Sequence, residues 1–219
     1  MASNYRLSVG NLVGMHPPVN RNRRAGPGRP SEGAREALLA ASRELFAARG
    51  YDSVSTAMVI ARAGVSRGAM YHHFASKREL FEALYVEMED ELVARLGTAA
   101  AGASSPLGGL RAGSRAYLRE CESPSDWSRI NLLQSREVLG ADRWQELAAD
   151  RGIGAVRAVI AAAMEAGETP NDDVSVVASI YMAALIEAGL LVARAADPAA
   201  TRATAERTLD RLLDGLARE

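Results

Sequence analysis

The chain has 219 residues, one cysteine and a formal net charge of −1, and only 5% of its residues are aromatic. This length fits one or two domains with a sizeable core. The single Cys121 excludes an internal disulfide, so we expect a reducing, cytoplasmic compartment.

The charge is distributed unevenly along the chain. Residues 1–78 contain 12 Arg+Lys against 4 Asp+Glu, a net charge of +8, and residues 79–219 contain 14 against 23, a net charge of −9. A basic half is typical of a polyanion-binding protein. The alternative is that the basic excess belongs to a solvated tail, and residues 1–30 alone contribute +5.

The first 30 residues are rich in Pro, Gly, Asn and Arg and show no periodicity, which predicts a disordered basic arm. Its end, Gly28-Arg29-Pro30, can enter an A·T-rich minor groove, or the arm can be held loosely by phosphates or by nothing. No apolar stretch in it reaches the length of a signal peptide, so we do not expect secretion.

A long helix is predicted over residues 31–49, ended by Gly50, and two short helices joined by a tight turn over about residues 56–75. We expect Thr56 to cap the first short helix and Ser66 the second. Gly64 suits the left-handed conformation that ends a helix. Helical spacing then turns Met70 and Phe74 inward.

The opposite side of the second short helix presents small, aromatic and cationic residues: Arg67, Gly68, Ala69, Tyr71 and His72. Glycine and alanine allow a close approach, and an Arg at the N-terminal tip can make the bidentate guanine contact that is common in the major groove. These features predict a helix-turn-helix that reads DNA. The plainer interpretation is a helical hairpin with solvated polar residues.

A further helix is predicted over about residues 77–96, with Ser76 and Glu79 at capping-box spacing. Lys77, the only lysine of the chain, lies at its N-terminus. A cation is unfavourable there because of the helix dipole, unless a phosphate binds at that end.

Beyond it, residues 97–109 are expected to connect two domains. Helical segments are predicted at about 107–122, 125–140, 142–167, 172–195 and 199–217, with Asp173 and Asp197 among the start signals of the last two. The window 174–193 is nearly long enough to span a bilayer, but Ser175, Ser179 and Glu187 interrupt it. We therefore expect a buried helix and no membrane partner.

Apolar walls with a few polar groups suit a small, largely apolar ligand. The candidates that we expect to line such an effector pocket are Tyr117, Trp127, Asn131, Gln134 and Tyr181, with Cys121, Trp144 and Met164 as further possibilities. For each of them, plain core packing is the alternative.

Catalysis is not expected. The three histidines are His16, in the arm, and His72 and His73, in the reading helix, and Cys121 has no evident basic partner. No phosphate-binding glycine loop is present, and adjacent helical histidines point about 100° apart. We expect no enzyme activity, no cofactor and no metal.

Residues 32–96 resemble the TetR family of bacterial transcriptional regulators. The matching pieces are residues 46–51 (FAARGY), 55–56 (ST), 63–66 (AGVS), 67–68 (RG), 71–74 (YHHF) and 76–77 (SK). The resemblance implies an all-α protein with a DNA-binding domain at 31–96 and an effector-binding and dimerisation domain at 97–219. It also implies a homodimer through about residues 172–217, an approximately palindromic operator, and repression released by a small molecule.

Carried over by position, the resemblance places DNA contacts on Thr56, Arg67, Gly68, Ala69, Tyr71, His72 and Lys77. Ala69 departs from the family pattern, because Thr or Ser is frequent there. Two other functions stay open. One is a non-specific DNA clamp or protein-interaction module on the same fold, and the other is a small-molecule-binding module that has lost DNA binding.

Overall fold

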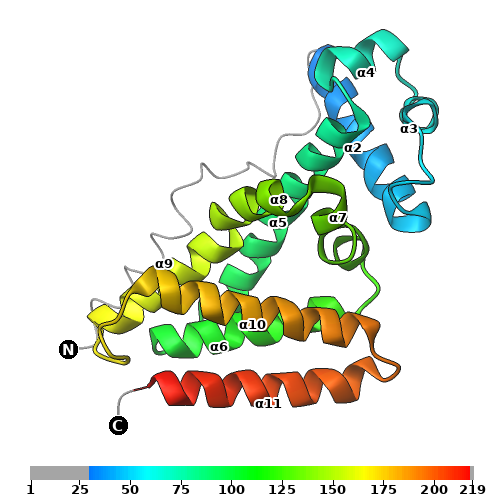
Figure 1. Cartoon of the computed structure of the whole chain (residues 1–219). Coiled ribbons are helices and arrows are strands. Elements are labelled where there is room, and N and C mark those ends of the chain that lie inside the picture. The colour runs from blue at the N-terminus through cyan, green and yellow to red at the C-terminus, as the bar shows by residue number, and fades with distance from the viewer. Residues whose placement is uncertain (1–29, 218–219) are drawn as a thin grey trace. The chain divides into compact units, whose positions relative to one another are not determined.

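The computed structural model describes residues 30–217, and every regular element in that range is a helix (Figure 1). The described residues form two compact units. The helix-turn-helix unit comprises residues 30–88 and 126–144, and the bundle unit comprises residues 89–125 and 145–217. The predicted basic arm lies outside the described residues, apart from Pro30.

The helix-turn-helix unit contains α2 (Pro30–Arg49), α3 (Thr56–Ala63), α4 (Arg67–His73) and the first half of α5 (Lys77–Ala100). Phe46, Tyr51 and Phe81 form an aromatic cluster with ring centroids 5.2–5.5 Å apart. Met70 and Phe74 are buried, as their spacing predicts. Burial of this inner side of α4 fixes which side faces outward.

The ends of α3 and α4 agree with the sequence except at one cap. Gly64 adopts φ 67°, and the Ser66 hydroxyl accepts the Ala69 N–H at 3.1 Å, which confirms both predictions. The cap of α3, however, is Ser55 and not Thr56. Ser55 has the extended backbone of a capping residue and accepts the Met58 N–H at 3.2 Å, whereas Thr56 is already the first helical residue.

Residues 126–144 pack with the helix-turn-helix unit, although they follow α6 in the chain. They contain η1 (Ser128–Leu132), which is a π-helix, α7 (Ser135–Leu139) and the start of α8 (Ala141–Ala149). The single helix predicted at 125–140 is therefore wrong, because the π turn and a turn at residues 133–134 interrupt it. Gly140, with a φ of 75°, follows the end of α7.

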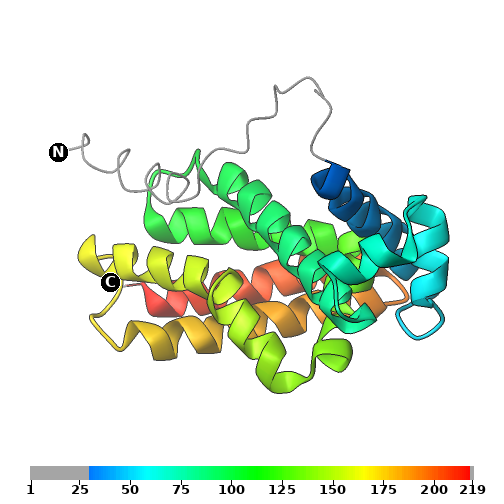
Figure 2. The same cartoon turned by 90° about the horizontal axis from the view of Figure 1, so that it is seen from above.

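The bundle unit is built from α6 (Pro106–Glu122), α9 (Gly152–Glu165), α10 (Val174–Arg194) and α11 (Pro198–Leu216), with the second half of α5. Helix α10 contacts α6, α9 and α11, and the four helices run alongside one another (Figures 1 and 2). Asp173 and Asp197 cap α10 and α11, as predicted.

Two segments of this unit differ from the sequence prediction. Residues 97–109 are not one connection, because α5 continues to Ala100 and Pro106 begins α6. The helix predicted at 142–167 breaks between α8 and α9. At the break the chain passes so close to itself that a Cβ on Gly154 would lie 3.0 Å from the Ala149 carbonyl.

Helices α6 and α10 cross at very short range. A Cβ on Gly189 would lie 2.7 Å from the Tyr117 hydroxyl and 2.9 Å from the Cys121 sulfur, so only glycine fits without a shift. The Tyr181 and Ser114 hydroxyls share a hydrogen bond of 2.8 Å in the same interface. Burial raises the pKa of the Cys121 thiol to about 12.

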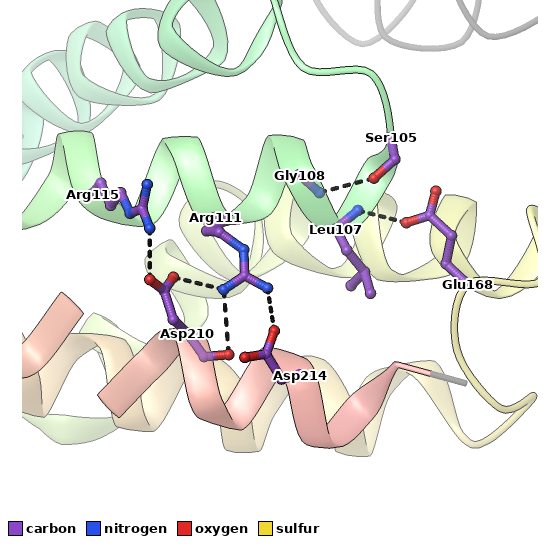
Figure 3. A network of polar contacts seen from close by, with 8 residues as sticks. All are labelled: Ser105, Leu107, Gly108, Arg111, Arg115, Glu168, Asp210 and Asp214. Carbon is purple, nitrogen blue, oxygen red and sulfur yellow. Dashed lines mark hydrogen bonds and ion pairs between the residues drawn. The ribbon is translucent and has the colours of Figure 1, made fainter. Parts of the chain in front are cut away.

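Polar side chains fasten α6 to α11 along one edge (Figure 3). Arg111 contacts Asp210 at 2.8 Å and Asp214 at 2.7 Å, and Arg115 contacts Asp210 at 2.6 Å. Burial opposes ionisation of Asp210, but the hydrogen bonds from Arg115 and Arg111 lower the pKa of its carboxyl below the usual value. At the start of α6, the Glu168 carboxylate accepts the Leu107 N–H at 2.9 Å.

The outer side of α10 is apolar and exposed, so its prediction as a buried helix holds for one side only. Tyr181, Leu185 and Gly189 are buried, whereas Ile180 is 67% exposed and Leu191 57%. Within the described residues, Val174–Arg194 is also the one helix long and apolar enough to cross a membrane, and 28% of its most apolar window is buried.

Candidate DNA-binding site

The outward side of α4 is open to solvent in the protomer. Arg67, Gly68 and His72 are exposed, Tyr71 is 44% exposed and Ala69 is half-buried. These are the residues that the sequence placed outward, and none of them is part of the core. The surface required for entering a groove of duplex DNA is therefore present on this helix.

Gly68 is not needed by the fold itself. A Cβ at this position would meet only the Ser66 hydroxyl, at 3.9 Å, which is ordinary contact. The helix would therefore accept a side chain here without internal strain. An exposed helical glycine costs stability relative to alanine, so its presence fits a need for close approach by a molecule outside the protomer.

Arg67 is held over the Tyr71 ring, with the guanidinium carbon 5.6 Å from the ring centroid. The two residues are one helical turn apart, so the cation–π contact forms on the helix surface. The contact limits the rotamers of Arg67 before any ligand arrives. A guanidinium that is restrained beforehand loses less entropy when it forms a bidentate bond.

The sequence stretch that contains α4 is positively charged although the unit as a whole is neutral. The described residues of the helix-turn-helix unit contain 10 Arg+Lys and 10 Asp+Glu. No acidic residue occurs between residues 53 and 78, a stretch that holds Arg62, Arg67, Lys77 and Arg78. The basic excess of the N-terminal half thus comes from the arm and from this stretch, which contains α4.

Lys77 has a structural role that the sequence did not reveal. Its ammonium donates to the Tyr51 and Val54 carbonyls, both at 2.9 Å, and lies 3.9 Å from the centroid of the Tyr51 ring. These bonds hold the loop before α3 against the start of α5. An ammonium has three N–H donors, so one remains for a phosphate. The phosphate contact stays a prediction, as does that of the half-buried Thr56.

The five predicted pocket residues fall into two groups. Tyr117 and Tyr181 are buried in the bundle unit, and Trp127, Asn131 and Gln134 belong to the helix-turn-helix unit. The Asn131 amide donates to the Tyr85 carbonyl at 3.0 Å, and both ends of the Gln134 amide bind backbone groups. The structure therefore gives Asn131 and Gln134 hydrogen bonds within their own unit. An effector role stays a prediction for all five residues.

No cluster of three His, Cys, Asp or Glu side chains suited to a metal ion occurs in residues 30–217. On α4, His72 and His73 have ring centroids 5.1 Å apart and an interplanar angle of 72°.

Two family models match the chain. Residues 38–84 match the model described as bacterial regulatory proteins of the tetR family, and residues 107–216 match the C-terminal domain described as tetracyclin repressor-like. The first match covers the helix-turn-helix, and the second covers half of the chain.

Individual relatives agree with the family models. The HTH-type transcriptional activator FasR of Mycolicibacterium smegmatis is 34% identical over 113 residues, which are 52% of this chain and 51% of FasR. UidR of Escherichia coli K12 is 34% identical over 61 residues, 28% of this chain and 31% of UidR. The chain thus spans about half or less of the length of these curated relatives.

Solved structures extend the similarity over most of the chain. A TetR-family transcriptional regulator from Pectobacterium atrosepticum has a TM-score of 0.73 and 31% identity, with 86% of this chain and 96% of that chain covered. FadR from Bacillus subtilis, solved in complex with stearoyl-CoA, has a TM-score of 0.65 at 15% identity, over 80% of this chain and 96% of that chain. The chain belongs to the TetR family and is a transcriptional regulator with a DNA-binding helix-turn-helix.

Proposed function

We propose that this regulator is a homodimeric, cytoplasmic repressor that binds an approximately palindromic operator and leaves it when a small effector binds. The observation that supports DNA reading most directly is the outward side of α4, which is exposed and capped at its start and lies in a stretch, residues 53–78, with four cations and no acidic residue. A surface of this kind attracts phosphates and admits base edges.

The proposed DNA contacts are those of the family pattern. Arg67 is assigned to a guanine and Gly68 and Ala69 to close approach of the helix, while Tyr71 and His72 contact phosphates or a thymine methyl. Thr56 and the third N–H of Lys77 bind phosphates. In the dimer, two such helices would enter successive major grooves about 34–36 Å apart.

The proposed dimer surface is the exposed apolar side of α10 and α11. An open groove on it is lined by Val177, Ile180, Tyr181, Ala184, Leu212 and Leu216. A second copy of the chain would remove this surface from water, which is the main driving force for stable homodimers. The surface falls within residues 172–217, the range that family resemblance assigns to dimerisation.

Release by an effector follows if the ligand binds more tightly to a dimer whose two α4 helices no longer match the groove spacing. We place the effector in the bundle unit, near Tyr117 and Tyr181. Stearoyl-CoA is a defined first probe, because Bacillus subtilis FadR, which has the same fold, was solved with it. The probe should lower operator affinity without lowering the Tm of the protein.

Activation is the alternative to repression, because FasR is named an activator. In-vitro transcription from a promoter that carries the selected operator decides between the two. A repressor lowers transcript yield as the protein is added, and an activator raises it.

Footprinting in excess competitor DNA tests the function as a whole. A regulator protects a defined, approximately two-fold symmetric site. Uniform protection with a steep salt dependence would instead identify a non-specific clamp.

A further inference from the structure

The Gln134 side chain spans three backbone groups of the helix-turn-helix unit. Its Oε1 accepts the Tyr51 N–H at 2.8 Å, and its Nε2 donates to the Arg129 carbonyl at 2.6 Å and to the Phe46 carbonyl at 3.4 Å. Both ends of the amide are therefore used. One of these partners is local, and the other two lie more than 80 residues earlier in the chain.

The distant partners sit where α2 ends and the reading motif begins. Phe46 is in the last turn of α2, Gly50 ends that helix with φ 76°, and Tyr51 supplies the first amide of the following loop. The Tyr51 carbonyl in turn accepts from Lys77. Hydrogen bonds therefore connect Gln134 to Tyr51, and Tyr51 to Lys77, the first residue of α5. Tyr51 belongs to the loop that leads into Ser55 and α3.

Several other contacts fix residues 126–144 on the same unit. Asn131 donates to the Tyr85 carbonyl at 3.0 Å, and Arg78 donates to the Leu139 carbonyl at 2.6 Å. Asp126 pairs with Arg43 at 3.4 Å. The segment that carries Gln134 is therefore attached at both ends and in the middle, so a shift of the segment must reach the loop that Gln134 holds.

The direction of Gln134 depends on the π turn of η1. The Leu133 N–H bonds to the Ser128 carbonyl, five residues back, at 3.1 Å. An α-helical turn would bond four residues back and rotate the following side chain by about 100°. Such a change would point Gln134 away from Tyr51. π turns are rare in proteins, and those that occur are often found at functional sites.

We propose that Gln134 is a positioning residue for DNA binding: it sets the loop at 50–54, and residues 126–144 thereby control the placement of α3 and α4. The proposal rests on the proposed function to the extent that α4 is the DNA reader. It adds a residue outside the DNA surface, and it replaces the predicted effector contact at Gln134 with a mechanical one.

The first test is Gln134→Met, which keeps the length of the side chain and removes its three hydrogen bonds. The matched control is Gln145→Met, since Gln145 is exposed on α8. Two quantities are measured below the Tm of every variant: hydrogen exchange of the Tyr51 and α4 amides without DNA, and the Kd per active molecule for the duplex that wild-type protein selects from a random library.

For Gln134→Met we expect exchange of the Tyr51 amide to accelerate about fivefold or more, as for a lost hydrogen bond of about 1 kcal/mol. Affinity should fall about three- to tenfold at an unchanged salt slope, because no phosphate contact is removed. Gln145→Met should match wild type in both. If affinity per active molecule stays at the wild-type value, Gln134 is only a stabilising residue and the proposal is overturned.

Gln134→Glu provides a second variant should the methionine chain fold poorly. A carboxylate still accepts the Tyr51 N–H but cannot donate to the Arg129 and Phe46 carbonyls. The second carboxylate oxygen would then face these two carbonyl oxygens, which repel it. We therefore expect protection of Tyr51 and affinity at or below those of Gln134→Met, and wild-type values for both would contradict the proposal.

Failure of the proposed function would look different. If wild-type protein selects no duplex, sequence-specific regulation is wrong. The positioning role is then tested by comparing Gln134→Met with wild type in two measurements. These are hydrogen exchange of the α4 amides and the affinity, at low salt, for a random duplex of about two helical turns.

Discussion

The protomer exposes two helical faces of opposite chemistry. The outward side of α4 carries Arg67, Tyr71 and His72 in a stretch without acidic residues, whereas the outward side of α10 and α11 carries Ile180 and Leu212, 67% and 48% exposed. Among the described residues, no side chain covers these exposed positions. Cations and aromatic rings suit a charged polymer, and a broad apolar surface suits a protein copy.

The comparison also shows how differently the two faces are supported. Helix α4 has seven residues and depends on the Ser66 cap and two buried side chains, Met70 and Phe74. Helix α10 has 21 residues and is pressed against α6 at Gly189. Short helices are marginal without tertiary support, so we expect the DNA face to be the more easily displaced of the two.

The largest effect is expected from Ile180→Glu, which places a charge in the apolar face. Desolvating an unpaired carboxylate opposes association, so the protein should become monomeric by sedimentation equilibrium. Operator affinity should fall about 100-fold, since two linked half-sites become one. Gln145→Glu, an equal charge change on exposed α8, should leave the dimer intact. A dimer that survives Ile180→Glu would place the second copy elsewhere.

Next in size is Arg67→Ala on the cationic face. We expect a loss of about 1–3 kcal/mol in operator binding and relaxed base preference at one position per half-site, measured by competition with single-base variants. Arg62→Ala is the control, because Arg62 is an exposed arginine of α3 that pairs with Glu44. Equal losses for both variants would mean that Arg67 supplies charge and not base reading.

Gly189→Ala probes the support behind the apolar face. The added methyl group has no room beside Tyr117 and Cys121, so unfolding free energy should drop by about 1–3 kcal/mol in chemical denaturation. Gly113→Ala is the matched control within α6, where a Cβ meets nothing within 4 Å. That variant should gain about 0.5–1 kcal/mol. If Gly113→Ala were destabilised as much as Gly189→Ala, lack of space would not explain the glycine at position 189.

The smallest effect is expected for Lys77→Ala, in the salt dependence of its DNA binding. If the third N–H meets a phosphate, binding to all sequences weakens and the slope of log K against log salt falls by about one. The Tm should fall as well, because the Tyr51 and Val54 carbonyls each lose one hydrogen bond. A lower Tm with an unchanged slope would assign Lys77 to the loop alone.

Local chemistry made much of this molecule predictable. Ser66, Asp173 and Asp197 begin helices by accepting backbone N–H groups within three residues, and Gly64 ends one because it lacks a Cβ and can adopt a positive φ. The adjacent hydroxyls of Ser55 and Thr56 show the limit of this reasoning. Either can cap, and the choice depends on the backbone path of the loop that Lys77 holds.

The placement of residues 126–144 with the helix-turn-helix unit could not be predicted, because it depends on contacts across more than 80 positions. The π turn has no sequence signal of its own, so an ordinary helix was the natural expectation. Gln134 therefore looked like a polar group for a pocket. The proposed DNA residues were easier, since their side chains share one side of a short helix whose inner side is plainly apolar.

The tight crossing at Gly189 makes the reactivity of Cys121 a measure of how closely α6 and α10 are packed. Cys121 is the sole thiol of the sequence, it is buried in that crossing, and burial raises its pKa to about 12. Thiolate is the reactive form, so a disulfide reagent such as Ellman's can modify the closed protein only very slowly. The rate of thiol modification then reports how often α6 and α10 separate. It can be measured on the wild-type protein, without an introduced probe, in the presence and absence of a ligand.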